Sequence, residues 1–418
     1  MSRDDRKLVN EINRRTLLLG SATTAAAMLG MSVKGAPAER QAKAGVNAQG
    51  DMGDPTREQG AGPSALGARS DFENVERRPV AGIASLTPIE KLQGTLTPSD
   101  LHFERHHAGI PKIDPDHHEL LLHGLVERPL KWNLRELRRF PSVTRICFIE
   151  CSGNYFPRAG DRSPPHLVCG LTSQSEWTGV PLATLLREAG VKRAASWLIA
   201  EGSDAALMSR SVPLDKALDD ALVVYAQNGE ALRPAQGYPV RLLLPGWEGN
   251  ANVKWLRRLE VTDMPAMTRD ETSKYTEPML NGTVRQFSFA VDARSVITYP
   301  AYPASIELGW HEIRGLAWSG RGRITRVEVS TDGGSTWQDA SLQGPVLAKA
   351  HTRFGLPWRW NGQATEIMSR ATDDTGYVQP TLKAILAERG PGSAPYHFNP
   401  ITGWQVRRDG ELRFSPTG

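Results

Sequence analysis

The sequence predicts an α+β fold, in which a mixed α/β domain is followed by a β-sandwich of immunoglobulin-like build. Between about residues 86 and 263, short helical patterns are scattered among strand patterns, without the regular alternation of a doubly wound sheet. From residue 264 to about residue 410, helix signals nearly vanish and strand patterns recur with turn residues between them. The Cys…Trp…Cys spacing of true immunoglobulin domains is absent. At 418 residues, the chain is long enough for two such domains.

The predicted elements of the first domain are short and carry their own start and stop signals. Asn133 is expected to cap a helix, and Pro181 and Gly190 to bound another. An Asn-Gly turn is expected at residues 228–229, between strand segments. The expected helices are residues 133–140, 181–190 and 213–220, and the expected strands are residues 118–126, 143–150, 196–202, 221–232 and 238–246, with residues 253–263 closing the region.

A β-hairpin is the clearest predicted element of the second domain. Residues 324–342 alternate apolar and polar side chains through Val327 and Val329, and the Asp-Gly-Gly sequence at residues 332–334 supplies a turn. Residues 305–320 show a similar pattern. Both stretches predict strands with one buried face, as a sandwich requires.

The N-terminus resembles an export signal. Arg14 and Arg15 stand directly before an Ala-rich apolar stretch at residues 17–31, and Ala-Pro-Ala at residues 36–38 has the form of a cleavage site. The stretch is too short and too polar to span a bilayer. We therefore expect a twin-arginine signal peptide at residues 1–38, a periplasmic location and a cofactor loaded before export. A cytoplasmic helix with a chance arginine pair is the alternative. Residues 39–85 predict an extended segment.

The charge of the chain argues against nucleic acid as a partner. Net charge is +4, and the first forty residues hold seven Lys/Arg and four Asp/Glu, a surplus of three. The remainder is nearly neutral and has no polybasic tail or stripe.

The sequence has three cysteines, and two of them, Cys147 and Cys151, lie at the end of the strand expected at residues 143–150. In an extended strand, residues four apart are separated by about 13 Å, too far for a disulfide. The cysteine and histidine spacings do not match a zinc site either. Cys151 could thus be a nucleophile, a ligand of another metal or a buried core residue.

Four segments, in this order along the chain, resemble the sulfite oxidase family of molybdenum enzymes: residues 101–111, 146–154, 223–261 and 327–337. Four ordered motifs are far more specific than any one of them. The resemblance implies an oxidoreductase molybdopterin-binding domain at residues 86–263 and a Mo-co oxidoreductase dimerisation domain at residues 264–410. It also implies a bound molybdenum cofactor, Mo-molybdopterin.

The resemblance also implies roles for single residues. Cys151 is expected to hold molybdenum, since a soft thiolate suits a metal already bound by the two sulfurs of a pterin dithiolene. Tyr225 and Arg105 are expected to be catalytic, the tyrosine through its hydroxyl and the arginine as an active-site cation. The expected cofactor contacts are His107, Asp204, Gln236, Arg241, Asn252, Val253 and Lys254.

Several of these residues have simpler explanations. His107 could be a surface histidine, Arg241 a charge at a sheet edge, Lys254 a solvated stem and Tyr225 a core aromatic. At Gln236 the family usually has a histidine.

Two positions depart from the family's sulfite-oxidising members, which surround the sulfite dianion with arginines. Phe156 stands where those members have one arginine, and Gln405-Val406 stand against their His-Arg pair. Residues 369–382 also resemble the molybdenum subunits of sulfane dehydrogenases in the bacterial sulfur-oxidising system. That resemblance implies oxidation, by oxo transfer, of a sulfane sulfur carried as a cysteine persulfide on a carrier protein. It further implies a c-type cytochrome as electron acceptor and a homodimer within a hetero-oligomer.

Three other functions remain open at this stage. In a periplasmic sulfite:cytochrome c oxidoreductase, Arg162 or Arg407 would replace the missing cations. A molybdenum enzyme could instead reduce sulfoxides. A binding module built on the sandwich, with Cys151 inert, is the non-enzymatic alternative.

Overall fold

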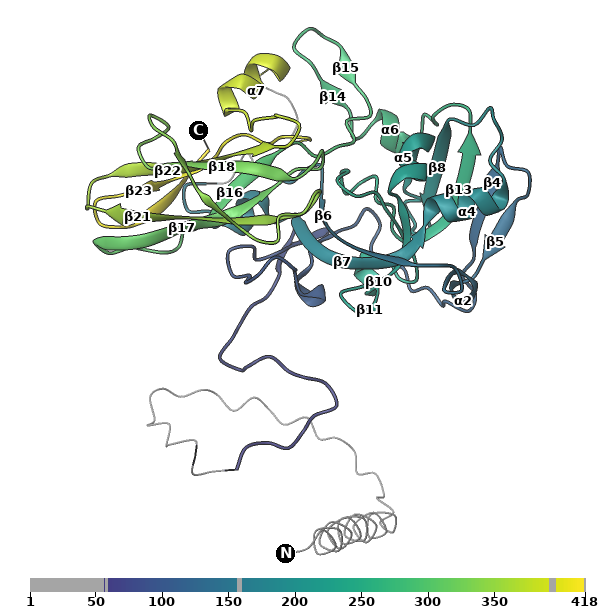
Figure 1. Cartoon of the computed structure of the whole chain (residues 1–418), viewed down its shortest axis with the longest axis horizontal. Coiled ribbons are helices and arrows are strands. Elements are labelled where there is room, and N and C mark those ends of the chain that lie inside the picture. Colours follow the sequence, from purple (N-terminus) through teal and green to yellow (C-terminus); the bar gives the residue numbers. More distant parts are fainter. Residues whose placement is uncertain (1–55, 57–58, 156–159, 391–395, 417–418) are drawn as a thin grey trace, which may run out of the picture. The chain divides into compact units, whose positions relative to one another are not determined.

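The computed structural model describes residues 56, 59–155, 160–390 and 396–416 (Figure 1). All the elements below lie in one compact unit, residues 70–418. The predicted signal peptide and Phe156 lie outside the described residues. Within the described residues, no helix has the length and apolar character needed to cross a membrane.

Two five-stranded sheets form the first domain. One has the order β11-β10-β7-β6, with β12 beside β10, and the other has the order β5-β4-β13-β8-β9. A small sheet, β1-β2-β3, precedes them. The strands are β1 (Arg78–Val80), β2 (Ala84–Leu86), β3 (Glu104–Arg105), β4 (Leu120–Gly124), β5 (Leu130–Trp132), β6 (Val143–Glu150), β7 (Thr172–Pro181), β8 (Trp197–Gly202), β9 (Ser209–Pro213), β10 (Leu222–Gln227), β11 (Glu230–Ala231), β12 (Arg241–Leu243) and β13 (Leu256–Thr262).

Short helices accompany these strands, and three of them, α2, α4 and α5, lie where the sequence predicts helices, whereas α3 and α6 are missing from the prediction. In α2, Asn133 accepts a hydrogen bond from the Glu136 amide and the Glu136 side chain returns one, which confirms the predicted cap. In α4, the Pro181 and Gly190 boundaries are confirmed, and Gly190 has a φ of 72° that favours glycine. The helices are α2 (Leu134–Leu137), α3 (Pro165–Cys169), α4 (Leu182–Ala189), α5 (Leu214–Asp219) and α6 (Arg269–Thr272).

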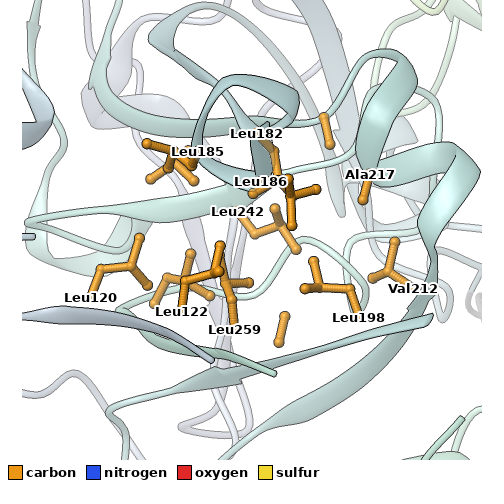
Figure 2. Close-up of a cluster of buried hydrophobic side chains, with 14 of the residues drawn as sticks. Leu120, Leu122, Leu182, Leu185, Leu186, Leu198, Val212, Ala217, Leu242 and Leu259 are labelled. Atoms are coloured by element: carbon orange, nitrogen blue, oxygen red, sulfur yellow. The ribbon is translucent and has the colours of Figure 1, made fainter. Parts of the chain in front are cut away.

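The core of the first domain lies where α4 packs on the strands. Leu182, Leu185 and Leu186 share one face of α4, because residues three and four apart lie on the same side of a helix. Figure 2 shows them beside leucines of β4, β8, β12 and β13. Burial of each leucine side chain contributes about 1.5–3 kcal/mol. The labelled residues of this cluster are Leu120, Leu122, Leu182, Leu185, Leu186, Leu198, Val212, Ala217, Leu242 and Leu259.

The second domain is a β-sandwich, as predicted (Figure 1). One sheet has the order β16-β17-β21-β20 and the other β19-β18-β22-β23-β24. The predicted hairpin is confirmed by the antiparallel pairing of β18 with β19. The strands are β14 (Glu277–Pro278) and β15 (Val284–Arg285), which form a separate hairpin, then β16 (Arg294–Tyr299), β17 (Gly309–Trp318), β18 (Ile324–Ser330), β19 (Gln338–Asp339), β20 (Ser341–Gln343), β21 (Thr352–Trp360), β22 (Thr365–Asp373), β23 (Gly403–Val406) and β24 (Leu412–Ser415).

The sandwich core contains Ile313 and Phe354 from the first of these sheets and Val327, Ile367 and Trp404 from the second. One helix of this domain, α7 (Leu382–Arg389), is missing from the sequence prediction. It buries Ile385 and Arg389 rather than a continuous apolar stripe, so the sequence lacks the usual helical signal.

The two domains meet along β6, the strand that leads to Cys151. The Phe148 ring stacks on His351 at a centroid distance of 5.6 Å, and its amide donates to the carbonyl of Lys349. At the end of the strand, the Glu150 carboxylate accepts hydrogen bonds from Arg294 (2.6 Å) and Trp318 (2.6 Å). The second domain therefore supports the backbone that presents Cys151.

Candidate active site

A cavity of about 670 Å³, part of it open to solvent, lies beside Cys151. Nine of the ten residues predicted for the site line it: Arg105, His107, Cys151, Asp204, Gln236, Arg241, Asn252, Val253 and Lys254. The sequence prediction missed the other lining residues, among them His102, Asn250, Trp255 and Tyr275.

Cys151 begins a tight turn directly after β6. Its amide donates to the carbonyl of Leu171 (3.0 Å), and its carbonyl accepts from the amide of Asn154 (2.9 Å). The backbone of Gly249 approaches this turn closely, and a Cβ there would lie 2.9 Å from the carbonyl oxygen of Glu150. Glycine at this position thus lets the loop at residues 249–254 lie against the turn.

All three cysteines are free thiols, and Cys151 lies in a different environment from Cys147 and Cys169. Cys147 and Cys169 are buried in the core, and burial raises the pKa of each to about 12. Burial also raises the pKa of Cys151, although the Gly153 amide and the charge of Arg105 oppose this effect. Cys151 lines the cavity, whereas Cys147 and Cys169 do not. Of the three, Cys151 alone is placed to bind a metal held in this cavity.

Two buried cations face the cavity without an anionic partner. Arg241 donates to the carbonyl oxygens of Gln236 (3.0 Å) and Asn252 (3.1 Å), and its guanidinium lies 5.1 Å from the Trp177 ring centroid. Lys254 donates to the carbonyl oxygens of Arg105 and Ala235, at 3.1 Å each. In the described part of the chain, neither side chain forms a salt bridge with a carboxylate.

The charges of Arg241 and Lys254 favour the binding of an anion in the cavity. Burial lowers the pKa of Arg241 to about 9. Burial, followed by the charge of Arg241, lowers the pKa of Lys254 to about 7. In addition, Nε of Arg241 is a buried donor without a hydrogen-bond partner among the described residues. Nε2 of His102 also lacks a partner, but it is an acceptor, because Nδ1 of this neutral ring donates to the carbonyl of Phe103. A bound anion would relieve the cost of burying these charges and accept a hydrogen bond from Nε of Arg241.

The remaining predicted contacts shape the cavity through hydrogen bonds. Gln236 donates to the carbonyl of Phe103 (2.8 Å), and Asp204 accepts from the amide of Met208 (3.2 Å). Asn252 accepts from the amide of Leu244 (2.7 Å), so much of its side chain is used in holding the loop. These side chains fix the positions of the backbone groups around the cavity.

A tyrosine and a histidine lie together at the open side of the cavity. Tyr275 Oη is 2.9 Å from Nε2 of His107. Burial raises the pKa of Tyr275 above its ordinary value, and burial, followed by the charge of Arg105, lowers the pKa of His107. Near neutral pH the hydroxyl is therefore protonated and the imidazole neutral, and a tautomer with the proton on Nε2 donates to Oη and leaves the hydroxyl proton directed elsewhere. Tyr275 also stacks under Arg210, whose guanidinium is 4.9 Å from the ring centroid.

The structure does not place Tyr225 at this cavity. Because successive side chains of a strand point to opposite faces, Val224 packs into the cluster that includes Cys151, whereas Tyr225 packs against the main core of the first domain. Its ring lies 5.5 Å from the guanidinium of Arg138. The tyrosine that lines the cavity is Tyr275. It lies in a loop between α6 and β14, where no periodic pattern singles it out.

The cavity continues outward into a mouth whose described residues carry little charge. Apolar residues of β1 and β2, with Leu171 and Tyr396, line much of it, and among the described residues of the mouth Arg105 and Lys274 carry permanent charge. Arg162 and Arg407 are exposed and line neither the cavity nor its mouth. Arg407 and Arg408 instead line a surface groove at the end of the sandwich, together with Gln405.

Two family models match the chain in the order of its domains. The oxidoreductase molybdopterin binding domain matches residues 107–269, and the Mo-co oxidoreductase dimerisation domain matches residues 285–403. Domain boundaries at residues 38, 85, 263 and 410 stay predictions.

The chain is similar to curated proteins and to a solved structure. It is 32% identical over 338 residues to sulfite oxidase from Gallus gallus, covering 72% of each chain. It is 32% identical over 336 residues to mitochondrial sulfite oxidase from Rattus norvegicus, covering 72% of this chain and 60% of that protein. Similarity to the NADH nitrate reductase of Ulva prolifera is 30% over 340 residues, covering 69% of this chain and 38% of that protein. The chain therefore spans less than two thirds of the latter two proteins.

The solved structure is the sulfane dehydrogenase SoxCD from Paracoccus pantotrophus. Its TM-score is 0.83 at 43% sequence identity, and the match covers 86% of this chain and 96% of the other.

The cavity fits the molybdenum cofactor that these relatives imply. The phosphate of a pterin cofactor matches the charges of Arg241 and Lys254, which have no carboxylate partner, and the pterin's hydrogen-bonding edges match the unpartnered Nε donor of Arg241 and the Nε2 acceptor of His102. A thiol, that of Cys151, lies at the same cavity and offers the soft ligand that molybdenum prefers. The chain belongs to the sulfite oxidase family of molybdenum-cofactor oxidoreductases.

Proposed function

We propose that this protein is the molybdenum subunit of a sulfane dehydrogenase. Its substrate is a sulfane sulfur carried as a cysteine persulfide on a carrier protein, and the electrons pass to a c-type cytochrome. The similarity to the sulfane dehydrogenase SoxCD supports this proposal, because it extends over 96% of that chain. We further propose that the protein is periplasmic, is exported by the twin-arginine pathway and dimerises through its second domain within a hetero-oligomer.

The low charge of the described part of the cavity mouth is the observation that carries the choice of substrate. Free sulfite is a small dianion, and its binding calls for several arginines in bidentate contact. Near Cys151, the described mouth offers Arg105 and Lys274 among largely apolar side chains. Such a mouth suits a sulfur atom that arrives on a peptide and carries less charge.

We assign the following roles to the chain's own residues. Cys151 binds molybdenum, and Arg241 and Lys254 hold the anionic end of the cofactor. When bound, the molybdenum cofactor supplies two-electron oxo-transfer chemistry. Arg105 stabilises negative charge that develops on the oxidised sulfur. Tyr275, oriented by its hydrogen bond to His107, holds a proton at Oη next to the reacting sulfur.

A substrate comparison on the purified holoenzyme tests the proposal. Reduction of a c-type cytochrome would be followed with a peptide that carries a cysteine persulfide, with the same peptide as a free thiol, and with sulfite. We expect turnover of the persulfide peptide, none of the thiol peptide, and kcat/KM for sulfite at least 10-fold lower than for the persulfide. Efficient turnover of sulfite with a micromolar KM, and none of the persulfide, would contradict the proposal.

The second candidate is a sulfite:cytochrome c oxidoreductase. The identity to sulfite oxidases favours it. It would require the described cations at the mouth, Arg105 and Lys274, to suffice for the dianion. The same comparison separates the two candidates.

A further inference from the structure

His397 lies between two carboxylates that come from different parts of the chain. Its Nδ1 is 3.0 Å from Oε1 of Glu248, and its Nε2 is 2.9 Å from Oδ2 of Asp292. Burial disfavours the charged ring, but the hydrogen bonds to Asp292 and Glu248 outweigh this effect and raise the pKa of His397 to about 10. Both ring nitrogens therefore donate near neutral pH.

The two carboxylates are themselves held in place. Asp292 pairs with Arg321 at 2.6 Å, at the start of the second domain. Glu248 accepts from the side chain of Asn250 at 2.8 Å, and its backbone carbonyl accepts from Asn252 at 2.9 Å. Asn250 and Asn252 line the cofactor cavity. The imidazolium thus connects the second domain to the loop that forms one wall of the cavity.

The backbone of His397 reaches the turn that carries Cys151. Its amide donates to the carbonyl of Ser152 at 2.9 Å. The preceding residue, Tyr396, lines the mouth, and its ring centroid is 5.3 Å from that of Tyr275. His397 has a φ of 53°, in the left-handed region that residues with a side chain rarely adopt. Such a conformation persists where surrounding contacts enforce it, and it is common near functional sites.

We propose that His397 is a positioning residue of the molybdenum site. Its imidazolium, held between Glu248 and Asp292, fixes the loop at residues 249–252 and the Cys151 turn relative to each other, and places Tyr396 at the mouth. This inference rests on the proposed function in one respect: it takes the cavity beside Cys151 as the molybdenum site. It does not depend on which substrate the enzyme oxidises. It assigns to the second domain a direct part in the geometry of the metal site.

The conservative variant His397→Asn tests this role on the holoenzyme. Asparagine tolerates the left-handed conformation, so the backbone can remain as it is while the charge and one donor are lost. The matched control is His166→Asn, which removes an imidazole that lies 2.5 Å from Glu90 and outside both the cavity and its mouth. The measurements are the Mo(V) electron paramagnetic resonance spectrum after partial chemical reduction, molybdenum per chain, and kcat and KM.

We expect His397→Asn to change the Mo(V) spectrum and to lower kcat by about 10–100-fold, the effect typical of residues that orient metal ligands. His166→Asn should keep the parent's spectrum and a kcat within about twofold. A parental spectrum and kcat in His397→Asn would overturn the proposal, whatever the loss in melting temperature.

Glu248→Gln provides a second variant if His397→Asn does not fold. This variant keeps the imidazole of His397 and an oxygen acceptor at position 248. We therefore expect the Mo(V) spectrum to change in the same direction as in His397→Asn, but less. A Mo(V) spectrum equal to that of the parent would overturn the proposal. The spectrum is obtained by chemical reduction and needs no sulfane turnover. A parent enzyme that fails to oxidise persulfide would therefore refute the proposed function while the test of His397 could still be carried out.

Discussion

Tyr275 Oη lies 2.9 Å from Nε2 of His107, and both side chains line the cavity beside Cys151. This hydrogen bond joins the loop after α6 to the segment after β3, which are 168 residues apart in the chain. This hydrogen bond therefore fixes the orientation of the tyrosine hydroxyl at the cavity.

Replacement of this hydroxyl should slow the reaction. We expect Tyr275→Phe to lower kcat by about 100-fold, with a much smaller change in KM, because a positioned proton donor acts mainly in the transition state. Tyr225→Phe is the matched control and should keep the parent's kcat, since Tyr225 packs against the core and Arg138. Steady-state kinetics with the persulfide peptide measures both. A loss confined to Tyr225→Phe would contradict the assignment.

The two tyrosines show what sequence patterns can and cannot provide. Tyr225 lies in a conspicuous motif, so it could be singled out, but the face to which it points could not be predicted, because the register of β10 shifts between Val224 and Ala226. Tyr275 follows a four-residue helix and precedes a two-residue strand, and only the folded chain brings it to His107. Cys151 could be singled out from the pattern because it directly follows a predicted strand, whereas Arg241 was expected only from the family resemblance.

The buried charge of Lys254 should make the stability of the cofactor-free protein depend on pH. The folded chain holds the Lys254 proton up to about pH 7, whereas the ordinary pKa is 10.5. Between these pH values the unfolded chain binds more protons than the folded chain. The free energy of unfolding therefore rises with pH from about 7 to about 10. Below pH 7 the amine is charged in both states, and the folded protein bears the whole cost of burying that charge.

The variant Lys254→Met isolates this contribution, because it removes the charge and keeps an apolar stem. We expect the melting temperature of the cofactor-free parent to rise relative to that of Lys254→Met between pH 7 and pH 10. In the holoprotein this relative rise should shrink, since a bound anion stabilises the charged amine. Parallel curves for the two cofactor-free proteins would contradict the assignment.

Arg241 should determine how firmly the cofactor is retained. We expect Arg241→Met to lower molybdenum per chain at least 10-fold after gel filtration, because a buried cation at the anionic end of the ligand is lost. Arg138→Met is the matched control: it removes a guanidinium that stacks on Tyr225 and does not line the cofactor cavity. Equal metal contents in Arg241→Met and the parent would show that Arg241 does not hold the cofactor.

The ion pair between Glu150 and Arg294 should be important for stability. The two side chains are buried and lie 2.6 Å apart, so Arg294→Met leaves the carboxylate without its cation and should cost about 3–5 kcal/mol. Arg128→Met breaks an exposed pair with Glu188 and should leave the free energy of unfolding nearly unchanged. Denaturant unfolding of the cofactor-free proteins measures both. Similar losses in the two variants would contradict the interpretation.

This ion pair also marks a limit of sequence analysis. Capping residues such as Asn133 act on neighbours in the chain, so the local pattern predicted α2 correctly. Arg294 and Glu150 are 144 residues apart, and His397 and Glu248 are 149 residues apart. The contacts that attach the second domain to the Cys151 turn therefore have no local signature, and α7 lacks one because it buries only Ile385 and Arg389.

The assignment of Cys151 as the molybdenum ligand underlies every role proposed above. X-ray absorption at the molybdenum edge counts the sulfur ligands of the metal directly. We expect three sulfurs in the parent, two in Cys151→Ser together with loss of activity, and three in the control Cys169→Ala, whose thiol is buried in the core. Three sulfur ligands and undiminished turnover in Cys151→Ser would contradict the assignment.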